Sequence, residues 1–414
     1  MVSLELLDKK LTMNKSTFFS GQPVFSQIIK MIPRILVSRA AFSKRSDRYY
    51  KKFDTYHHLI TMLYASFQHC TSLREVVTGL QACEGRLQPL NINYLPARST
   101  LSEANQRRTY EVFEQLYFDL FERYRHFLPD SRKKDKLFNR LVIIDSTTIS
   151  LFQEILKNAG RPAVNGKKKG GIKVHMAINA REDVPHLIRL TAASRADVPL
   201  MKELNPPKGS IVVMDKGYNS FHMMNTWHKA GVDWVTRVRY NAVYEVTEEL
   251  KVSEKDIASG VISDQLIVMG FKNNQIEQVG CRLVCYYDKE KQKVFQFITS
   301  NKRWTPSRIA SLYKQRWQIE ILFKRLKQNM PLEYFLGDNE NAIKIQIYCS
   351  LIADLLLKTV MSRLKRRWSF SNLASFVRLH LLNYTHLYKF LEMPEKCKVY
   401  NPAPKMQLQL NLYG

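Results

Sequence analysis

Apolar positions in the first 130 residues follow a helical period. Apolar side chains recur at intervals of three and four residues from Ile28 to Leu36 and again from Leu59 to Phe67. Farther along, Thr100 and Glu103 form a pair typical of a capping box and predict a helix rich in polar and basic residues. Together with the helical run Ser72–Ala82, this helix fits either a helix-turn-helix-like DNA reader or one more helix of an all-α domain.

After a hydrophilic segment at residues 131–136, the pattern changes to strands. Two continuous apolar runs, Leu141–Ile144 and Ile211–Met214, each predict a strand buried on both faces, and each is followed by an aspartate, Asp145 and Asp215. Between and after them, strands are predicted at Ile172–Asn179, His186–Thr191 and Trp234–Val238, with helices at Val198–Leu204 and from Ser220 to Ala230. Alternating strands and helices predict an α/β fold.

From Asn241 to Ser300 the chain shows alternating residues and turn signals, which predict a β-rich insertion. Thr305 and Pro306 then suit the start of a helix. The chain is helical again after Pro331. The boundaries expected from these changes are 1–130, 131–239, 240–300, 301–340 and 341–414.

Four unlike polar residues recur within the helix that follows the insertion: Tyr313, Arg316, Glu320 and Lys327. At roughly 100° of rotation per helical residue, they would share one face about 60° wide. A carboxylate flanked by cations and a phenol suits a surface that holds phosphates and metal ions side by side. This helix is therefore predicted to meet a polyanion.

The composition also indicates a polyanionic partner. The chain has 64 Lys and Arg against 37 Asp and Glu, a net charge of +27, with 45% hydrophobic residues for a core. Binding to nucleic acid should be strongly salt dependent. The apolar run Ile347–Leu357 is short for a membrane span and contains Asp354, and the N-terminus lacks the apolar region of a signal peptide. We expect a soluble, cytoplasmic, nucleoid-associated protein with no membrane partner, whose six cysteines stay reduced.

Three carboxylates have positions that suggest chemistry: Asp145, Asp215 and Glu320. Carboxylate oxygens suit Mg²⁺ or Mn²⁺, and two such ions can clamp the attacking and leaving oxygens of a phosphoryl transfer. Each residue also has a simpler interpretation, because a strand-end aspartate is often a turn former and Glu320 is well placed to pair with Lys324. Taken together, the three favour a metal-dependent site for phosphodiester chemistry.

The residues Asp145-Ser146-Thr147, Asp215-Lys216-Gly217-Tyr218 and Tyr313-x2-Arg316-x3-Glu320-x6-Lys327 resemble the three DDE signatures of the insertion sequence 4 family of bacterial transposases. The resemblance covers about residues 140 to 340. The run Gly21–Arg74 is also similar to a small N-terminal domain found in many members.

The resemblance implies an RNase H-like catalytic core interrupted by the β-rich insertion, with an all-α N-terminal DNA-binding domain and a helical C-terminal region. It implies that Asp145, Asp215 and Glu320 hold two Mg²⁺ or Mn²⁺ ions, and that Tyr313, Arg316 and Lys327 contact DNA phosphates. Family members cut both ends of their element, some through a DNA hairpin, and insert it into target DNA. A homodimer in the DNA complex is expected because two ends must be paired.

Further candidates for DNA contact are Lys216, Lys173 and His175, of which His175 also fits a structural role. A hairpin step would need an aromatic side chain to hold a flipped base; Trp304 is a candidate, and Trp234 fits a core position better. The cationic loop Lys167–Lys169 also suits phosphate contact. Two alternatives remain open, namely a structure-specific nuclease on the same core and a non-catalytic DNA-binding regulator derived from a transposase.

Overall fold

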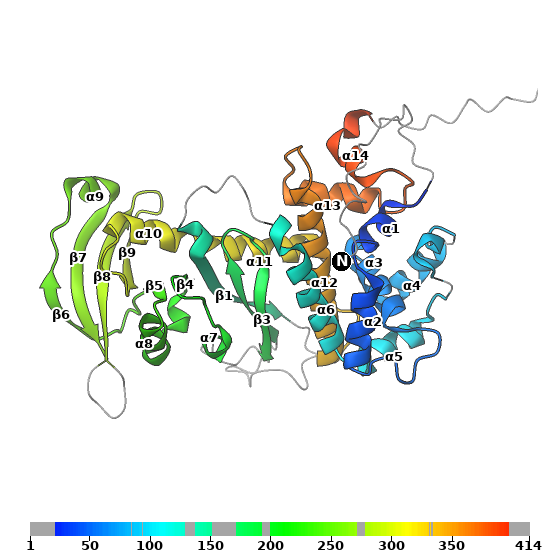
Figure 1. Ribbon diagram of the computed structural model, residues 1–414, viewed down its shortest axis with the longest axis horizontal. Coiled ribbons are helices and arrows are strands. Elements are labelled where there is room, and N and C mark those ends of the chain that lie inside the picture. Colours follow the sequence, from blue (N-terminus) through cyan, green and yellow to red (C-terminus); the bar gives the residue numbers. More distant parts are fainter. Residues whose placement is uncertain are drawn as a thin grey trace, which may run out of the picture.

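The computed structural model describes residues 21–83, 85–92, 94–128, 137–150, 171–192, 199–270, 278–330, 332 and 334–396. In Figure 1 a large sheet with flanking helices fills one half of the molecule, and a bundle of helices fills the other. The cationic loop Lys167–Lys169 lies outside the described residues. The cysteines in the described part of the chain are free, as expected.

The described strands form a nine-stranded sheet in the order β3-β2-β1-β4-β5-β9-β8-β7-β6. β1 pairs in parallel with β4, and β4 with β5, whereas β2, β3 and β9 join through antiparallel pairing. In sheet order the strands are β3 (Pro185–Ala192), β2 (Gly171–Asn179), β1 (Leu141–Ser150), β4 (Ile211–Met214), β5 (Asp233–Arg237), β9 (Lys293–Thr299), β8 (Val279–Asp288), β7 (Val261–Met269) and β6 (Tyr244–Glu249).

The insertion continues the core sheet, since β9 pairs with β5 through Val235 opposite Thr299 and carries β8, β7 and β6 beyond it. Its β-rich character agrees with the prediction. Two elements were not predicted, β6 and the short helix α9 (Glu254–Ser259). β6 escapes the apolar pattern because most of its side chains are exposed.

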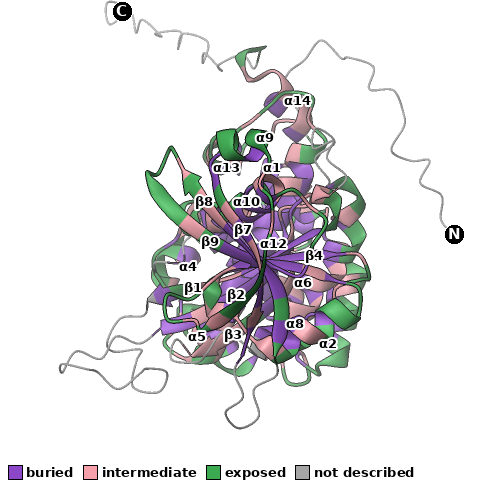
Figure 2. Cartoon of the chain, turned by 90° about the vertical axis from the view of Figure 1, so that its left-hand side faces the viewer, coloured by how far each residue is buried: buried purple, intermediate pink, exposed green. Residues whose placement is uncertain are grey.

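Both faces of the sheet are covered at its central strands β1 and β4, as their buried apolar runs require. Along β1, Leu141 and Ile143 belong to the cluster that continues into the helical half, whereas Val142 and Ile144 face a second cluster. That second cluster is covered by α7 (Pro199–Glu203) and α8 (Phe221–Lys229). Figure 2 shows the buried strands at the centre and exposed residues on the outer helices. The alternation along β1 therefore places its odd-numbered residues on the face covered by α11 (Trp317–Asn329).

The helical half combines both ends of the described chain around α12. Asn341 on α12 donates to the carbonyl oxygens of Asn105 and Arg108, and the backbone amide of Val24 donates to the carbonyl of Asn383 at 3.1 Å. Regions predicted as separate N-terminal and C-terminal parts thus share one core. These helices are α1 (Val24–Ile29), α2 (Arg34–Ser43), α3 (Thr55–Gln68), α4 (Leu73–Ala82), α5 (Arg98–Arg107), α6 (Glu111–Tyr124), α12 (Glu340–Ser362), α13 (Phe370–Leu379) and α14 (Leu387–Glu392).

Two expectations about helices change. α5 begins at Arg98, so Thr100 lies inside the helix and the predicted capping box does not form. The connection from α4 runs from Cys83 to Ala97 through a 3₁₀ turn, whereas a helix-turn-helix uses a turn of about three to four residues. The arrangement therefore favours an ordinary helix of an all-α domain.

The helix α12 is longer than its apolar run suggested. With 23 residues it is long and apolar enough to cross a membrane, but 83% of its most apolar window is buried inside the protein. The core helix of a soluble protein meets the same test of length and composition. Its buried Asp354 forms an ion pair with Arg325 of α11, which gives this polar residue a partner within the core.

Candidate active site

Asp145 and Asp215 are brought side by side by the pairing of two parallel strands. Ile144 of β1 lies opposite Met214 of β4, and the two aspartates follow immediately. Asp215 comes directly after the end of β4, as predicted, whereas Asp145 lies in the middle of β1. The apolar run ends at Ile144, but the strand continues through polar residues because β2 pairs with it as far as Ser150.

Arg316 connects Glu320 to Asp145. The guanidinium of Arg316 donates to Asp145 Oδ2 at 2.6 Å through Nη1 and to Glu320 Oε1 through Nη2. Both ion pairs are partly buried, with 14% of the Arg316 side chain exposed. Three carboxylates separated by long stretches of sequence thus converge where α11 crosses β1.

The helix predicted to run unbroken from Tyr313 to Lys327 is two helices. α10 (Pro306–Lys314) ends with Tyr313 in its last turn, and α11 begins at Trp317. The break arises because the amide of Arg316 bonds to the carbonyl oxygen of Tyr313, three residues back, which tightens the turn. A constant 100° per residue therefore does not hold across the break. The start at Pro306 after Thr305 agrees with the prediction, although the Thr305 side chain makes no capping hydrogen bond.

A second arginine holds Asp215. Arg237, the last residue of β5, donates to Asp215 Oδ1 through Nη2 at 2.8 Å, and the Tyr313 hydroxyl donates to the same oxygen at 3.3 Å. The Tyr313 ring packs 4.9 Å from the ring of Phe297, measured between centroids. Tyr313 therefore connects the end of α10 to the sheet at the candidate site.

The charges of the site act on one another. Burial raises the pKa of Asp145 to about 6; the charges of Asp215 and Glu320 add to this rise and Arg316 opposes it. Burial also acts to raise the pKa of Asp215, but the hydrogen bond and charge of Arg237 outweigh it and lower that pKa. Burial raises the pKa of Tyr313 to about 12, so its hydroxyl stays protonated near neutral pH.

The donor set fits a hard divalent cation, because it consists of carboxylate oxygens. In the described residues, however, no group of three carboxylate, imidazole or thiol side chains is arranged to hold one ion. The reason lies in Arg316, whose N–H groups bond both Asp145 and Glu320. Asp145, Asp215 and Glu320 have the chemistry of a magnesium or manganese site, and their oxygens are occupied here by guanidinium groups.

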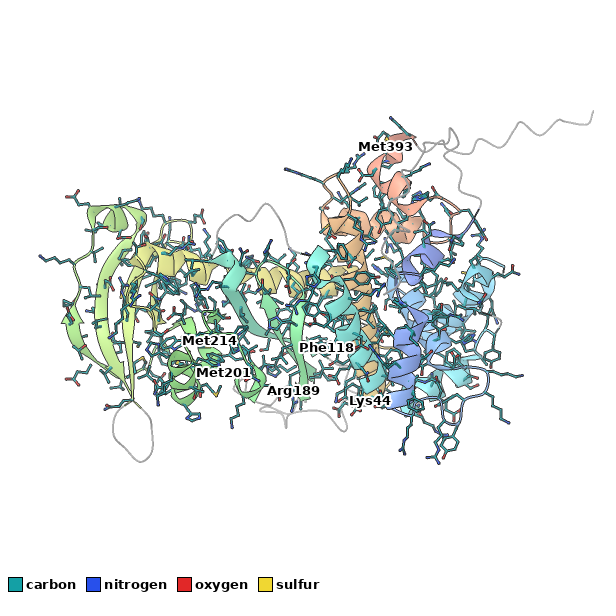
Figure 3. The ribbon with its side chains drawn as sticks, viewed as in Figure 1. Lys44, Phe118, Arg189, Met201, Met214 and Met393 are labelled. Carbon is teal, nitrogen blue, oxygen red and sulfur yellow. The ribbon has the colours of Figure 1, made fainter. Side chains whose placement is uncertain are left out.

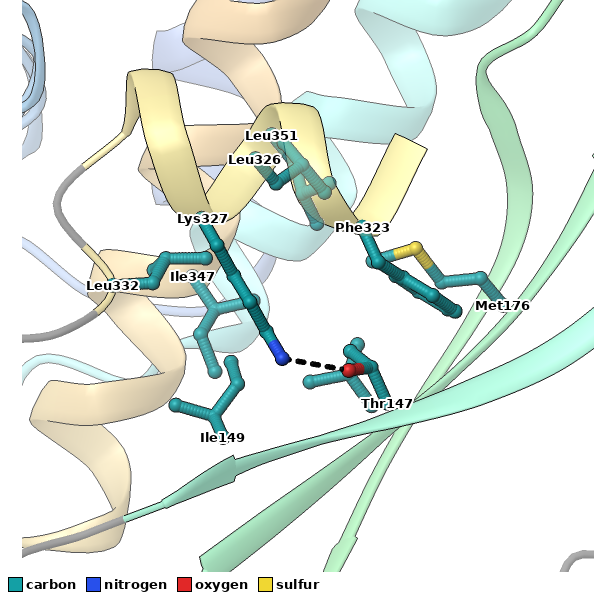
Figure 4. A pocket seen from close by; sticks show the side chains of 10 residues that line it. Thr147, Ile149, Met176, Phe323, Leu326, Lys327, Leu332, Ile347 and Leu351 are labelled. Carbon is teal, nitrogen blue, oxygen red and sulfur yellow. Dashed lines mark hydrogen bonds between the residues drawn. The ribbon is translucent and has the colours of Figure 1, made fainter. Parts of the chain in front are cut away.

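The predicted cations lie at different depths. Lys327 is exposed, and its Nζ donates to Thr147 Oγ1 of β1 at 3.0 Å, above a small apolar pocket between α11 and the sheet (Figure 4). Lys216 is exposed in the 3₁₀ turn that follows Asp215. Lys173 is half-buried on β2, opposite Thr148. Lys216 thus directly follows Asp215 in the chain, and Lys327 lies on the same helix as Glu320.

His175 was named from the sequence as a candidate for DNA contact, and the structure buries it. Only 2% of it is exposed, its Nε2 lies 2.9 Å from Thr191 Oγ1 and its Nδ1 lies 3.4 Å from the Tyr218 hydroxyl. His175 therefore lies in the core in this structure and is not exposed for contact with DNA. Trp234 is buried, as expected, and Trp304 is partly buried against the main core while its carbonyl oxygen accepts from Arg282.

Two residues near the site were not singled out from the sequence. Arg237 is a charged residue near the end of the predicted strand Trp234–Val238, and that position could have pointed to it. Trp317 begins α11 with 55% of its surface exposed, and Lys291 Nζ lies 5.5 Å from its ring centroid. An exposed tryptophan next to Arg316 was the available signal for this second residue.

The sheet carries adjacent aspartates, the covering helix carries a glutamate, and basic groups surround them. This arrangement is typical of an enzyme that acts on the phosphodiester bonds of nucleic acid. The model of the transposase DDE domain family matches residues 136–356, and this match implies an RNase H-like core. The chain belongs to that family and is a DNA transposase of the bacterial insertion-sequence type. A second model, of a domain of unknown function, matches residues 20–93.

The similar proteins include further transposases. A putative transposase named y4zB from Sinorhizobium fredii is 29% identical over 68% of this chain and 75% of its own. A putative transposase for insertion sequence element IS4SA from Synechocystis is 28% identical over 64% of this chain and 71% of its own. A looser likeness is to a piggyBac transposase synaptic complex with hairpin DNA, with a TM-score of 0.40 and 14% identity over 93% of this chain and 81% of that one.

Proposed function

We propose that this transposase cleaves DNA at the terminal inverted repeats of its own element and transfers the freed strands into target DNA, with Asp145, Asp215 and Glu320 as the catalytic carboxylates. The observation that supports the proposal is their convergence: strand pairing aligns the two aspartates, and one guanidinium bonds Asp145 and Glu320. A binding module has no use for three partly buried carboxylates among basic groups.

The three carboxylates would hold two Mg²⁺ or Mn²⁺ ions. When bound, such ions activate an attacking oxygen and offset the negative charge of the phosphoryl transition state. The protein's own task is to hold the carboxylates close despite their mutual repulsion. Arg316 and Arg237 do this here by neutralising them.

DNA contacts are proposed for Tyr313, Arg316 and Lys327, with Arg237 added. Within the described part of the chain, the buried Nε atoms of both Arg316 and Arg237 have no hydrogen-bond partner. Each guanidinium therefore keeps a buried donor without a partner, which a phosphate oxygen would satisfy once the side chain turns away from its carboxylates. Lys216 and Lys173 are proposed as weaker electrostatic contacts.

An aromatic residue is needed if excision proceeds through a hairpin, because a flipped base must stack on a side chain. Trp304 remains a proposal for this role, although it is partly buried. Trp317 is the better exposed of the two and adjoins Arg316.

We also propose membership of the insertion sequence 4 group, a DNA-binding N-terminal region within residues 1–130, a homodimer on paired ends, and action in the cytoplasm at the nucleoid.

The test uses purified protein, Mg²⁺ and duplexes carrying the repeats that flank the coding sequence. Asp145→Asn, Asp215→Asn and Glu320→Gln should each abolish cleavage while end binding stays near that of the unchanged protein. The matched control is Glu290→Gln, which removes an exposed carboxylate paired with Lys314 and should cleave normally. Cleavage that survives in any of the three site variants would remove that residue from the active site.

A structure-specific nuclease is the nearest rival. A pre-cut end with a free 3′-hydroxyl separates the two activities, because only strand transfer joins it to a target plasmid. Joined product that depends on Glu320 supports the proposal. Hydrolysis without any joined product would favour the nuclease, and binding without either reaction would favour a regulator.

A further inference from the structure

A basic cleft of about 450 Å³ lies in the helical half, between α5 and the loop that follows α2. It is separate from the carboxylate site, whose residues come from the sheet, α10 and α11. Figure 3 labels Lys44, which lines the cleft, at the lower edge of the helical half. Among its lining residues are five cations and one carboxylate: Lys44, Arg45, Arg48, Arg107, Arg108 and Glu103.

Two of the five cations have no acidic partner among the residues that the structure describes. Lys44, Arg107 and Arg108 form ion pairs with carboxylates at 3.0, 2.7 and 3.2 Å respectively. Arg45 and Arg48 are exposed, and neither forms an ion pair with any residue that the structure describes. The exposed Lys51 and Lys52 continue the same loop, so the loop that lines the cleft carries an excess of positive charge.

Arg45 occupies a backbone conformation that favours glycine. Its φ is 52°, in the left-handed region. It ends α2 in a Schellman motif, with the Arg45 amide bonded to the carbonyl of Phe42 at 3.1 Å and the Ser46 amide to that of Ala41 at 3.0 Å. Glycine is the usual residue at this position because a side chain adds steric cost there. An arginine at that position suggests that its side chain is used.

The base of the cleft contains a fixed charge. Arg108 is 1% exposed, and its Nε and Nη1 have no hydrogen-bond partner among the described residues. Its guanidinium carbon lies 4.3 Å from the centroid of the Tyr50 ring. Above it Tyr49 is 82% exposed, with the guanidinium of Arg48 5.3 Å from its ring centroid. Cations interleaved with exposed aromatic rings are typical of surfaces that bind nucleic acid.

We propose that this cleft binds the phosphodiester backbone of double-stranded DNA, with Arg45 and Arg48 as the residues that contact phosphate. The inference rests on the proposed action at element ends, and it assigns part of the end binding to the helical half. Because the contacts are to phosphate, they would position the DNA without reading its sequence. Duplex DNA is favoured as the occupant because a transposase must hold its substrate at points beyond the cleaved bond.

Two variants separate binding from folding. Arg45→Gly removes the guanidinium but suits the left-handed backbone, so its thermal stability should equal or exceed that of the unchanged protein. Arg48→Gln removes the second unpaired cation. The matched control is Lys202→Ser with Lys229→Ser, which removes two exposed charges from α7 and α8 on the other side of the sheet. All variants also carry Glu320→Gln so that no cleavage occurs.

Fluorescence anisotropy of a labelled duplex with the flanking repeat measures affinity against salt concentration. The double variant of Arg45 and Arg48 should bind on the order of tenfold more weakly near physiological salt, with a salt slope reduced by about 1.8, while the control keeps both. Unchanged affinity and slope, an equal loss in the control, or RNA competing better than duplex DNA would each overturn the proposal. If the protein with only Glu320→Gln fails to bind the ends, and the unchanged protein fails to cleave them, the proposed function itself is overturned.

Discussion

A buried quartet of charges fixes α11, the helix that carries Glu320 and Lys327. Arg325 of α11 donates to both carboxylate oxygens of Asp354 on α12, at 2.8 and 3.1 Å. It also donates to Asp183 in the turn between β2 and β3 at 2.7 Å, and Lys358 bonds the same aspartate. Arg325 is 7% exposed and Asp354 1% exposed. The quartet therefore consists of two neutral pairs that are largely removed from water.

Removing Arg325 should be costly because it leaves Asp354 buried without a cation. The charges of Asp354 and Asp183 outweigh the effect of burial and raise the pKa of Arg325, so its guanidinium stays charged. Breaking a buried pair by deleting one partner costs about 3–5 kcal/mol of unfolding free energy. We expect a loss of that size for Arg325→Met. Arg39→Met, which breaks an exposed pair with Asp119, should cost roughly 0–1 kcal/mol.

The double variant Arg325→Met, Asp354→Leu provides the sharper test. It removes one complete pair and leaves Lys358 with Asp183, so no unpaired charge stays buried. Its loss should be no larger than that of Arg325→Met alone. The sum of the losses of the two single variants, Arg325→Met and Asp354→Leu, should therefore exceed the loss of the double variant by a coupling energy of at least about 2 kcal/mol. Additive losses, or a loss for Arg325→Met as small as that for Arg39→Met, would refute the reasoning.

Urea unfolding at pH 7.5, followed by tryptophan fluorescence and circular dichroism, measures these differences. The cleavage assay adds a second measurement, because α11 presents Glu320 to β1. A tilt of α11 in the double variant should lower the cleavage rate while end binding is kept. Full cleavage activity in a stable double variant would show that the quartet contributes to stability alone.

Three further predictions follow from single residues. Burial lowers the pKa of His58 from 6.5 to about 3, so as the pH falls the unfolded chain binds a proton before the folded chain does, and stability is lost below pH 6.5. Between pH 7.5 and 5.5 this loss amounts to roughly 1.4 kcal/mol of unfolding free energy. Measured by urea unfolding, the loss should vanish in His58→Gln and persist in His222→Gln. Gly260→Ala should lower the melting temperature, because φ is 112° and the new Cβ would clash with the backbone oxygen of Tyr287. Gly280→Ala meets no atom within 4 Å and should leave the melting temperature unchanged. Chelation of divalent ions should stop cleavage but leave binding of the ends, and cleavage that continues in chelator would contradict a metal-dependent site.

The sequence predicted the sheet well where burial left a clear pattern. Leu141–Ile144 and Ile211–Met214 are buried on both faces and formed strands as expected. Where side chains are exposed or polar the pattern is weaker, which explains why β6 was missed and why the polar second half of β1 was not recognised. Pairing between strands distant in sequence, such as β5 with β9, depends on register that no local pattern encodes.

The candidate site was predicted in its members but not in its contacts. Asp145 and Asp215 could be matched because each follows a continuous apolar run, and the parallel pairing of those runs then aligns them. The spacing that selected Arg316 assumed a continuous helix, whereas the break before α11 turns its guanidinium to a position between Asp145 and Glu320. Which charges neutralise one another is decided by that break and by Arg237 at the end of β5. A motif can thus specify which residues meet, but the pairing of their charges follows from the backbone that carries them.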